Sequence, residues 1–333
     1  MAAISYRQNS HVNNTYQQKG VITEEIQGLI RVHRDGHVER PPIVPCVSCS
    51  SQPCRSVTSR DIFINKETNL WARLYVPARS NTKLIPLLIY FHGGGFCVGS
   101  ASWSCYHEFL TNVASKANCV ILSVEYHLAP ESRLPSAYED GFNTVMWLKQ
   151  ESLNTSSGQK WWLSQTNLSS LYLAGDSAGA NIAFHVASRI SSNTSLSLRG
   201  IILIQPFFGG EERTISEKQY SNQFLSLSAS DTYWRLSLPL GANRDHHYCN
   251  PLVNGFSKLR DLRVSGVLVC VSELDIMRDR NLGFSDALAR SGKKVETVMF
   301  KGVGHAFQIL TNSHLSQSRT QEMINHIKSF ISQ

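Results

Sequence analysis

Residues 173–179 combine the end of an apolar segment with a serine between two glycines. They read Leu-Ala-Gly-Asp-Ser-Ala-Gly, so Ser177 lies where a predicted strand turns into a predicted helix that begins near Ala178. Such a turn strains the backbone of the serine and exposes its hydroxyl beyond the sheet. Glycines flank the turn because a Cβ atom at position 175 or 179 would collide with the neighbouring strand or the serine backbone. The pattern predicts that Ser177 is a nucleophile that attacks a carbonyl carbon.

A second segment suited to the same chemistry is rich in glycine. Residues 85–91 are apolar and predict a buried strand, and His-Gly-Gly-Gly-Phe follows at 92–96. Consecutive glycines after a strand let backbone N–H groups converge on one negatively charged oxygen. A tetrahedral intermediate needs two or three such donors already in place. We assign these donors, as an oxyanion hole, to the backbone N–H groups of Gly94, Gly95 and Ala178.

A carboxylate that could orient a histidine follows another predicted strand. The apolar run 266–271 ends in Ser-Glu-Leu-Asp-Ile, and Asp275 is our candidate for the acid. In an open α/β sheet the carboxyl ends of parallel strands meet at one edge, which places Asp275 at the same edge as Ser177. Glu273 and Asp279 are nearby alternatives, although Asp279 is better suited to begin the next helix.

The candidate general base is His305, one of twelve histidines. It lies in a loop of small residues after the strand-like run 295–300, and such a loop lets the imidazole approach Ser177. A carboxylate bound to this imidazole would hold the required tautomer and stabilise the imidazolium. The order Ser177, Asp275, His305 along the chain is that of the α/β-hydrolases and differs from the orders in chymotrypsin and subtilisin.

Six apolar segments, most of them separated by helical stretches, would hold these residues at one sheet edge. The segments are residues 88–91, 119–124, 171–174, 200–205, 267–271 and 295–300. Near-continuous apolar strands are buried on both faces, which is typical of a mostly parallel sheet flanked by helices. Residues 61–65 and 69–76 predict an antiparallel hairpin that brings the sheet to eight strands. The predicted class is α/β, with the architecture of an α/β-hydrolase.

Composition and charge argue against several classes of protein. The 333 residues carry a formal net charge of +7, but no run of Lys and Arg exceeds a pair, so nucleic-acid binding is not expected. No stretch of 18 apolar residues occurs, so no membrane span is expected. Residues 1–20 are polar and lack an apolar signal core, which predicts a disordered tail and a cytoplasmic location. Cys46, Cys49 and Cys54 have no fourth ligand at a suitable spacing, so we expect no zinc site, and no other metal or cofactor is predicted.

Taken together, the motifs resemble the plant carboxylesterase family, in the hormone-sensitive-lipase-like branch of the α/β-hydrolases to which the gibberellin receptors are related. The resemblance rests on residues 92–96, 175–179, Asp275 and 304–307, and it extends from about residue 22 to the end of the chain. Two positions in a supporting loop depart from the family pattern, because His127 and Ser132 stand where Arg and His are usual. The triad positions are unaffected.

The resemblance implies a serine carboxylesterase that works through an acyl-enzyme, with a small-molecule ester as its substrate. It also leaves two alternatives open. Gibberellin receptors resemble these enzymes but lack the catalytic histidine, and some relatives are dehydratases or cyclising enzymes with altered nucleophile or oxyanion residues. The intact Ser177, Asp275 and His305 favour hydrolysis over a hormone-like receptor or a lyase that uses the same site. The sequence does not specify the oligomeric state of the protein.

We expect residues 21–333 to form one domain, with two segments acting as a cap over the site. Residues 21–56 begin with apolar residues at 22, 26, 29 and 30, a spacing that suits one face of a helix. Residues 208–250 lie between two predicted strands, where similar hydrolases insert helices. Such a cap would exclude water and select the acyl and alcohol groups of the substrate.

The predicted substrate is an ester with a small to medium apolar acyl group. This prediction depends on apolar side chains that could line a pocket but could equally belong to the core, namely Phe96, Phe207, Ile276 and Phe307.

Overall fold

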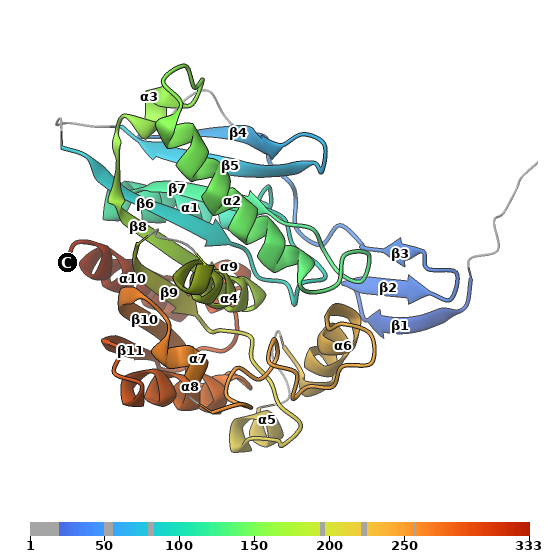
Figure 1. The fold of residues 1–333 in the computed structure, drawn as a ribbon. Helices are drawn as coiled ribbons and strands as arrows, with labels where there is room; N and C mark the ends of the chain where they lie inside the picture. The colour runs from blue at the N-terminus through green and yellow to red at the C-terminus, as the bar shows by residue number, and fades with distance from the viewer. Residues whose placement is uncertain (1–19, 50–55, 79–82, 194–196, 221–224, 256) are drawn as a thin grey trace, which may run out of the picture. The chain divides into compact units, whose positions relative to one another are not determined.

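The computed structural model describes residues 20–49, 56–78, 83–193, 197–220, 225–255 and 257–333 (Figure 1). Residues 1–19 of the predicted tail and Cys54 therefore lie outside the described residues. The chain divides into two compact units, Met1–Pro41 and Pro42–Gln333, which are taken in turn.

The described part of the first unit is a small antiparallel sheet. Its strands are β1 (Ile22–Ile26), β2 (Ile30–His33) and β3 (Val38–Glu39), in the order β1-β2-β3. The helix predicted for this segment is wrong. Ile26 and Ile30 are cross-strand partners on either side of a turn in which Gly28 has a φ of 76°. A separation of four residues therefore reflects hairpin register here, and the β-branched residues favour the strand.

The second unit contains an eight-stranded sheet, as predicted. Along the sheet the described strands follow the order β11-β10-β9-β8-β6-β7-β5-β4. Only the pairs β4–β5 and β5–β7 are antiparallel. The strands are β4 (Val57–Asn65), β5 (Leu70–Pro77), β6 (Ile85–Phe91), β7 (Val120–Glu125), β8 (Thr166–Asp176), β9 (Leu198–Ile204), β10 (Val264–Ser272) and β11 (Val295–Phe300).

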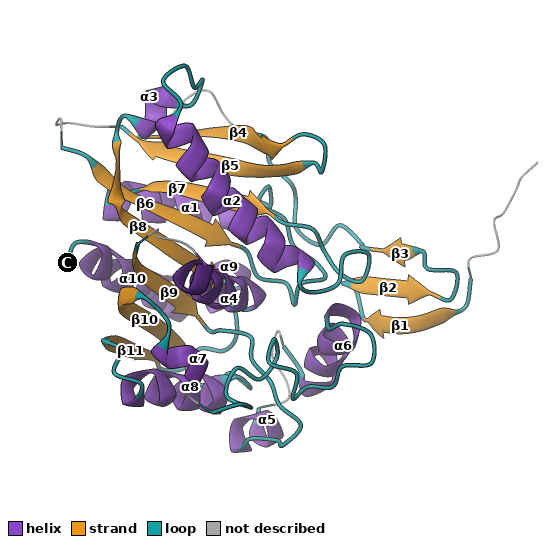
Figure 2. Ribbon diagram, viewed as in Figure 1, coloured by secondary structure: helices purple, strands orange, loops and turns teal. Residues whose placement is uncertain are grey.

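Helices cover both faces of this sheet (Figure 2). On one face α1, α9 and α10 pack together, and on the other α2, α4 and α8 follow the strands. The described helices are α1 (Ser104–Ala117), α2 (Ser136–Leu153), α3 (Lys160–Leu163), α4 (Ala178–Asn193), α5 (Ile215–Gln219), α6 (Leu227–Ser237), α7 (Ser257–Arg260), α8 (Arg278–Arg290), α9 (Phe307–Leu310) and α10 (His314–Ile331).

The core follows from the two-residue period of the strands. Alternate strand residues such as Tyr90, Ile121 and Ile202 pack under α1 and α10, while their neighbours, such as Ile89 and Ile201, are buried on the other side. Burial on both faces holds the central strands in register. The carboxyl ends of β6, β8, β9, β10 and β11 are therefore fixed along one edge of the sheet, where the predicted site residues follow.

Between β9 and β10 the chain contains helices, as the sequence indicates. Helix α5 begins with a capping box in which Thr214 and Glu217 bind each other's backbone N–H groups. Helix α6 is capped by Ser226, whose hydroxyl accepts a hydrogen bond from the N–H of Ala229. Each cap satisfies N–H groups that a helix leaves free at its start, which explains where these two helices begin.

Candidate active site

Ser177 occupies the turn between β8 and α4, and its backbone is strained. Its φ is 52°, a left-handed value that is uncommon for a residue with a Cβ atom. A Cβ atom at Gly175 would overlap the backbone of Gly179, and one at Gly179 would overlap the carbonyl of Phe91. The two glycines are therefore required by the close approach of β8, α4 and β6. The N–H of Ser177 donates to Ile204 O at 2.8 Å, which ties the turn to β9.

The structure brings the three predicted triad residues together. His305 Nε2 lies 2.9 Å from Ser177 Oγ, and His305 Nδ1 lies 2.7 Å from Asp275 Oδ2. The other carboxylate oxygen of Asp275 accepts a hydrogen bond from Met277 N at 3.0 Å. All three side chains are buried, with 6% of Ser177 and 7% of His305 exposed. A buried carboxylate with both oxygens bound holds the imidazole ring in one orientation.

The surroundings of His305 act on its pKa in opposite directions. Burial lowers the pKa, since it disfavours the charged imidazolium. The charge and hydrogen bond of Asp275, with a further contribution from the charge of Asp176, outweigh burial, so the pKa of His305 is raised above its ordinary value of 6.5. A raised pKa makes the imidazole a stronger base toward the serine proton.

The two alternative acids have other partners. Glu273 accepts a hydrogen bond from the N–H of Gly302 at 2.8 Å. Asp279 lies in the first turn of α8 and accepts one from the N–H of Ser216 at 2.7 Å. Asp279 thus attaches α5 to the start of α8.

The glycine loop after β6 contains two residues in the left-handed region. Gly94 and Gly95 both have positive φ values, 110° and 58°. A Cβ atom at Gly94 would overlap the carbonyl of Val98. Among the residues that the structure describes, none accepts a hydrogen bond from the N–H groups of Gly94, Gly95 or Ala178. These N–H groups therefore remain available to a ligand oxygen.

Asp176, which has no predicted function in the sequence, supports this loop. Its carboxylate is buried and accepts hydrogen bonds from Tyr90 (2.7 Å), Tyr106 (3.0 Å) and the N–H of Gly93 (3.0 Å). Burial raises the pKa of Asp176 to about 6, although these three donors lower it. The sequence contains one indication of this role, because Asp176 is a charged residue next to the serine, at a position that a central strand is expected to bury.

Gln205, directly after β9, also has no predicted function in the sequence. Its side chain accepts a hydrogen bond from the N–H of Ala306 at 2.6 Å and donates one to Ser272 Oγ at 2.7 Å. A polar side chain directly after an apolar strand, ahead of a proline, was the only signal in the sequence. His92, the residue before the glycines, is buried and contacts Gly93 O through Nδ1 at 2.8 Å. Burial lowers the pKa of His92 to about 4, although the bond to Gly93 opposes this.

The four apolar side chains predicted to line a substrate pocket are all buried. Phe207 stacks on Trp234 of α6 with ring centres 4.6 Å apart, and Phe96 lies 5.5 Å from the same ring. Phe307 belongs to the core under α1 and α10, where it packs on Phe300. Ile276 is 2% exposed. Their contact with a substrate stays a prediction.

Helices α5 and α6 are attached to different sides of the site. The hydroxyl of Ser216 in α5 donates to Ile276 O at 2.8 Å, beside Asp275. The ring of Tyr233 in α6 lies against Gly95. Arg133 donates to the carbonyl of Arg235 in the last turn of α6 and to that of Leu238, directly after α6, at 2.7 Å each. The insertion is therefore fixed both to the loop of the acid and to the glycine loop.

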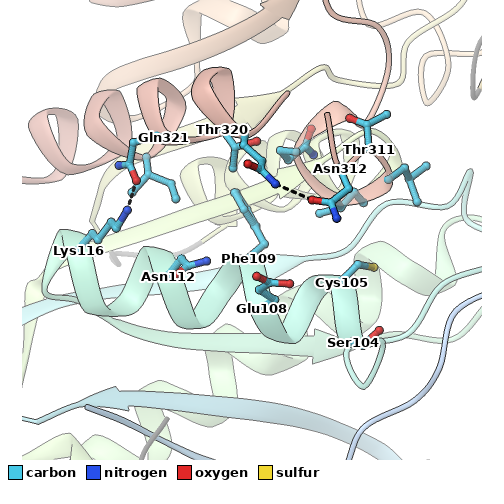
Figure 3. A pocket seen from close by; sticks show the side chains of 15 residues that line it. Ser104, Cys105, Glu108, Phe109, Asn112, Lys116, Thr311, Asn312, Thr320 and Gln321 are labelled. Carbon is cyan, nitrogen blue, oxygen red and sulfur yellow. Dashed lines mark hydrogen bonds between the residues drawn. The ribbon is translucent and has the colours of Figure 1, made fainter. Parts of the chain in front are cut away.

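A separate pocket of about 460 Å³ lies between α1, α9 and α10 (Figure 3). Its lining is mainly polar, and Lys116 hydrogen-bonds Gln321 across it, as Figure 3 shows. Ser177, Asp275 and His305 do not line it. Within the described ranges no group of three or more His, Cys, Asp and Glu side chains could hold a metal ion. No helix in the same ranges is long and apolar enough to cross a membrane.

Comparison with known proteins places the chain in a family. Residues 88–309 match a family model described as alpha/beta hydrolase fold. Probable carboxylesterase 6 of Arabidopsis thaliana is 47% identical over 320 residues, which are 94% of this chain and 92% of that protein. The 2-hydroxyisoflavanone dehydratase of Glycyrrhiza echinata is 33% identical over 93% of this chain and 96% of that protein. A solved esterase of Pyrobaculum calidifontis superposes with a TM-score of 0.69 and 25% identity, covering 84% of this chain and 86% of that one.

These findings confirm the resemblance and the fold predicted from the motifs. Fold, the arrangement at the sheet edge and the relatives agree. The chain belongs to the plant carboxylesterase family, within the hormone-sensitive-lipase-like α/β-hydrolases, and is a carboxylic-ester hydrolase.

Proposed function

We propose that the protein hydrolyses its ester through an acyl-enzyme, with Ser177 as nucleophile, His305 as general base and Asp275 as the group that orients the histidine. The observation that carries the proposal is the continuous row of hydrogen bonds from Asp275 Oδ2 through both ring nitrogens of His305 to Ser177 Oγ, at 2.7 and 2.9 Å. Nucleophile and base within hydrogen-bond reach, with the base oriented by a third group, are the requirements of this chemistry.

In the first half of the reaction, His305 Nε2 takes the proton of Ser177 as Oγ attacks the ester carbonyl carbon. The carbon–oxygen double bond opens, and its electron pair moves to the carbonyl oxygen. When the tetrahedral intermediate collapses, the bond to the alcohol oxygen breaks. The proton on His305 passes to that oxygen, so an alcohol leaves and an acyl group remains on Ser177.

Negative charge on the intermediate would be held by the N–H groups of Gly94, Gly95 and Ala178. Support comes from their lack of acceptors in the described part of the chain, and from the positive φ values that turn the two glycines. Donors already in place cost no reorganisation when charge develops, and each contributes about 3 kcal/mol to stabilising the transition state.

In the second half, water attacks the acyl-enzyme while His305 accepts one of its protons. The proton then returns to Ser177 Oγ as the carboxylic acid leaves. We propose esters with small to medium apolar acyl groups as the substrate class. Buried aromatic rings beside the site, among them Phe96 and Phe207, support this proposal because apolar walls favour apolar acyl groups over charged ones.

A direct test compares Ser177→Ala with the unaltered protein and with Ser169→Ala, in which an exposed serine outside the site is changed. We expect hydrolysis of p-nitrophenyl acetate and butyrate to fall by at least about 1000-fold in Ser177→Ala, with normal rates in Ser169→Ala. A fluorophosphonate should add one adduct to the unaltered protein and none to Ser177→Ala. Normal turnover by Ser177→Ala would refute the proposed nucleophile.

An elimination at the same site is the second candidate, and the 33% identity to a dehydratase supports it. In that reaction His305 would remove a carbon-bound proton, and the electron pair of the broken C–H bond would form the double bond. The neighbouring carbon–oxygen bond would break, and its hydroxyl would leave as water with a proton from His305, so no acyl-enzyme would form. Trapping separates the two reactions, because rapid denaturation during turnover should recover Ser177 carrying the mass of the acyl group only for hydrolysis. A turnover that yields an alkene and leaves Ser177 unmodified would favour elimination.

A further inference from the structure

Gln205 lies where the backbones of three loops of the site meet. It follows the last residue of β9, it is fully buried, and its φ is 47°. Its N–H donates to Cys270 O of β10 at 2.8 Å. Ile204, directly before it, accepts the N–H of Ser177. A residue other than glycine keeps a left-handed backbone only where its surroundings fix it, and such residues cluster at functional sites.

The side chain of Gln205 joins the loop of the histidine to the strand that leads to the acid. Its Oε1 accepts the N–H of Ala306, the residue after His305, at 2.6 Å. Its Nε2 donates to Ser272 Oγ at 2.7 Å, and Ser272 ends β10 just before the loop that carries Asp275. One amide therefore spans the segments that hold the proposed base and the proposed acid.

Ala306 needs this support more than an ordinary loop residue does. Its φ is 55°, and it is the N-cap residue directly before α9. Its N–H is buried, and a buried N–H without an acceptor is destabilising. If the acceptor were lost, Ala306 would turn to find another, and the imidazole of His305 would turn with it. A displacement of about 1 Å at a reacting group can cost about 100-fold in rate.

We propose that Gln205 is a positioning residue that aligns His305 with Ser177 and Asp275 through the N–H of Ala306. The inference rests on the proposed function of the triad, because alignment matters only if His305 is the base. A glutamine is suited to this position since its amide supplies both the acceptor for Ala306 and the donor for Ser272.

Two variants separate alignment from a merely structural effect. Gln205→Met has a similar length but cannot accept from Ala306, so kcat should fall by about 10- to 100-fold while KM stays within about twofold. Gln205→Glu restores the acceptor, and the hydroxyl of Ser272 can donate to the new carboxylate. Its kcat should therefore recover most of the loss at pH values at which His305 is neutral.

The pH profile gives a second readout. The charged groups that face His305 are Asp275 and Asp176, and Gln205 adds no charge. A carboxylate at position 205 would add negative charge near the imidazole and raise its pKa, so the acidic limb of kcat/KM should move to higher pH in Gln205→Glu. In Gln205→Met the limb should move little while the plateau falls. The shift in Gln205→Glu follows from its charge near His305, whereas a role in packing alone predicts that the plateau of Gln205→Glu is no higher than that of Gln205→Met.

Gln165→Met is the matched control, because Gln165 is a partly buried glutamine that donates to Trp161 O at 2.7 Å, just before β8 at the opposite end from Ser177. It should retain normal kcat, KM and pH profile. Should Gln205→Met fail to fold, Ser272→Ala and Gln205→Glu carry the test. Ser272→Ala removes only the contact in which Gln205 Nε2 donates and keeps the acceptor for the N–H of Ala306. Its kcat should therefore fall less than that of a variant in which residue 205 cannot accept from Ala306.

The inference is overturned if folded Gln205→Met has the kcat of the unaltered protein, or if the plateau of Gln205→Glu is no higher than that of Gln205→Met. It is also overturned if Gln205→Glu fails to move the acidic limb. Failure of the proposed function would look different, because the unaltered protein would then neither hydrolyse the esters nor react with the fluorophosphonate.

Discussion

The ring of Tyr233 lies directly against Gly95, so closely that a Cβ atom at position 95 would overlap the ring. Tyr233 belongs to α6 in the insertion between β9 and β10, whereas Gly95 belongs to the loop after β6. The same ring lies edge-on to Phe207, whose N–H binds Ser177 O at 3.0 Å. The insertion therefore contacts both the glycine loop and the residues that fix the serine.

Gly95→Ala should reduce activity strongly with little effect on substrate binding. The new methyl group would overlap Tyr233, and the φ of 58° is unfavourable for alanine, so the N–H of residue 95 would move away from the developing negative charge. Loss of one oxyanion donor predicts a fall in kcat of about 100-fold or more. Steady-state kinetics with p-nitrophenyl butyrate measure it.

Gly158→Ala is the control for this change, since a Cβ atom there would meet open space. Its kcat should stay normal. If Gly95→Ala keeps a normal kcat as well, the N–H of Gly95 is not an oxyanion donor.

The rate of hydrolysis should fall with acidity at a pH above the ordinary histidine pKa. Catalysis requires neutral His305, whose pKa is raised above 6.5 because Asp275 and Asp176 outweigh burial. As the pH falls through this raised pKa the imidazole becomes protonated and cannot accept the serine proton. The acidic limb of kcat/KM for p-nitrophenyl acetate, corrected for spontaneous hydrolysis, should therefore have its midpoint above pH 6.5. A midpoint below pH 6 would contradict a histidine with a raised pKa as the base.

Motifs with a fixed backbone requirement were predictable from the sequence. The turn at Ser177 could be placed because only glycine fits at positions 175 and 179, between β8, α4 and β6. The glycine loop could be placed because a Cβ atom at Gly94 or Gly95 would overlap its neighbours. The strands could be placed because a central strand buried on both faces is apolar throughout. For the same reason the edge of the sheet that carries Asp275 and His305 followed from the strand ends.

Residues that act through tertiary contacts were not predictable in this way. A spacing of four residues, as between Ile26 and Ile30, fits one face of a helix and equally fits a pair of residues opposite each other in a hairpin. The turn at Gly28 makes this segment a hairpin. Gln205 has no neighbour in sequence that points to Ala306, a hundred residues later. Phe307 packs on Phe300 in the core, a tertiary contact that composition does not specify, and its predicted contact with a substrate stays a prediction.

Asp176→Asn should move the acidic limb of the pH profile to lower pH. The negative charge of Asp176 raises the pKa of His305, and an amide of the same shape removes that charge. The asparagine oxygen can still accept from Tyr90 and the N–H of Gly93, so the glycine loop should keep its position. The plateau of kcat/KM should fall by less than about tenfold. A limb that stays in place would show that Asp176 has no electrostatic effect on the base.

Breaking the buried ion pair between Arg280 and Glu217 should lower the free energy of unfolding more than breaking an exposed ion pair does. Arg280 in α8 donates to both carboxylate oxygens of Glu217 in α5, at 3.0 and 3.1 Å. The Glu217 side chain is 2% exposed and that of Arg280 is 13% exposed. Arg280→Met leaves a buried carboxylate without its cation, which costs about 3 kcal/mol of unfolding free energy. Urea denaturation followed by tryptophan fluorescence measures this loss.

Arg290→Met is the matched control, because it removes another arginine of α8 from an ion pair. Arg290 and Asp286 are 70% and 72% exposed, and water screens such a pair, so the loss should stay below about 1 kcal/mol. The difference between the two variants isolates the effect of burial. Equal losses would mean that Glu217 does not depend on Arg280, since the N–H of Thr214 also binds that carboxylate at 2.7 Å. A larger loss in Arg280→Met would establish that this ion pair holds α5 against α8, next to the loop of Asp275.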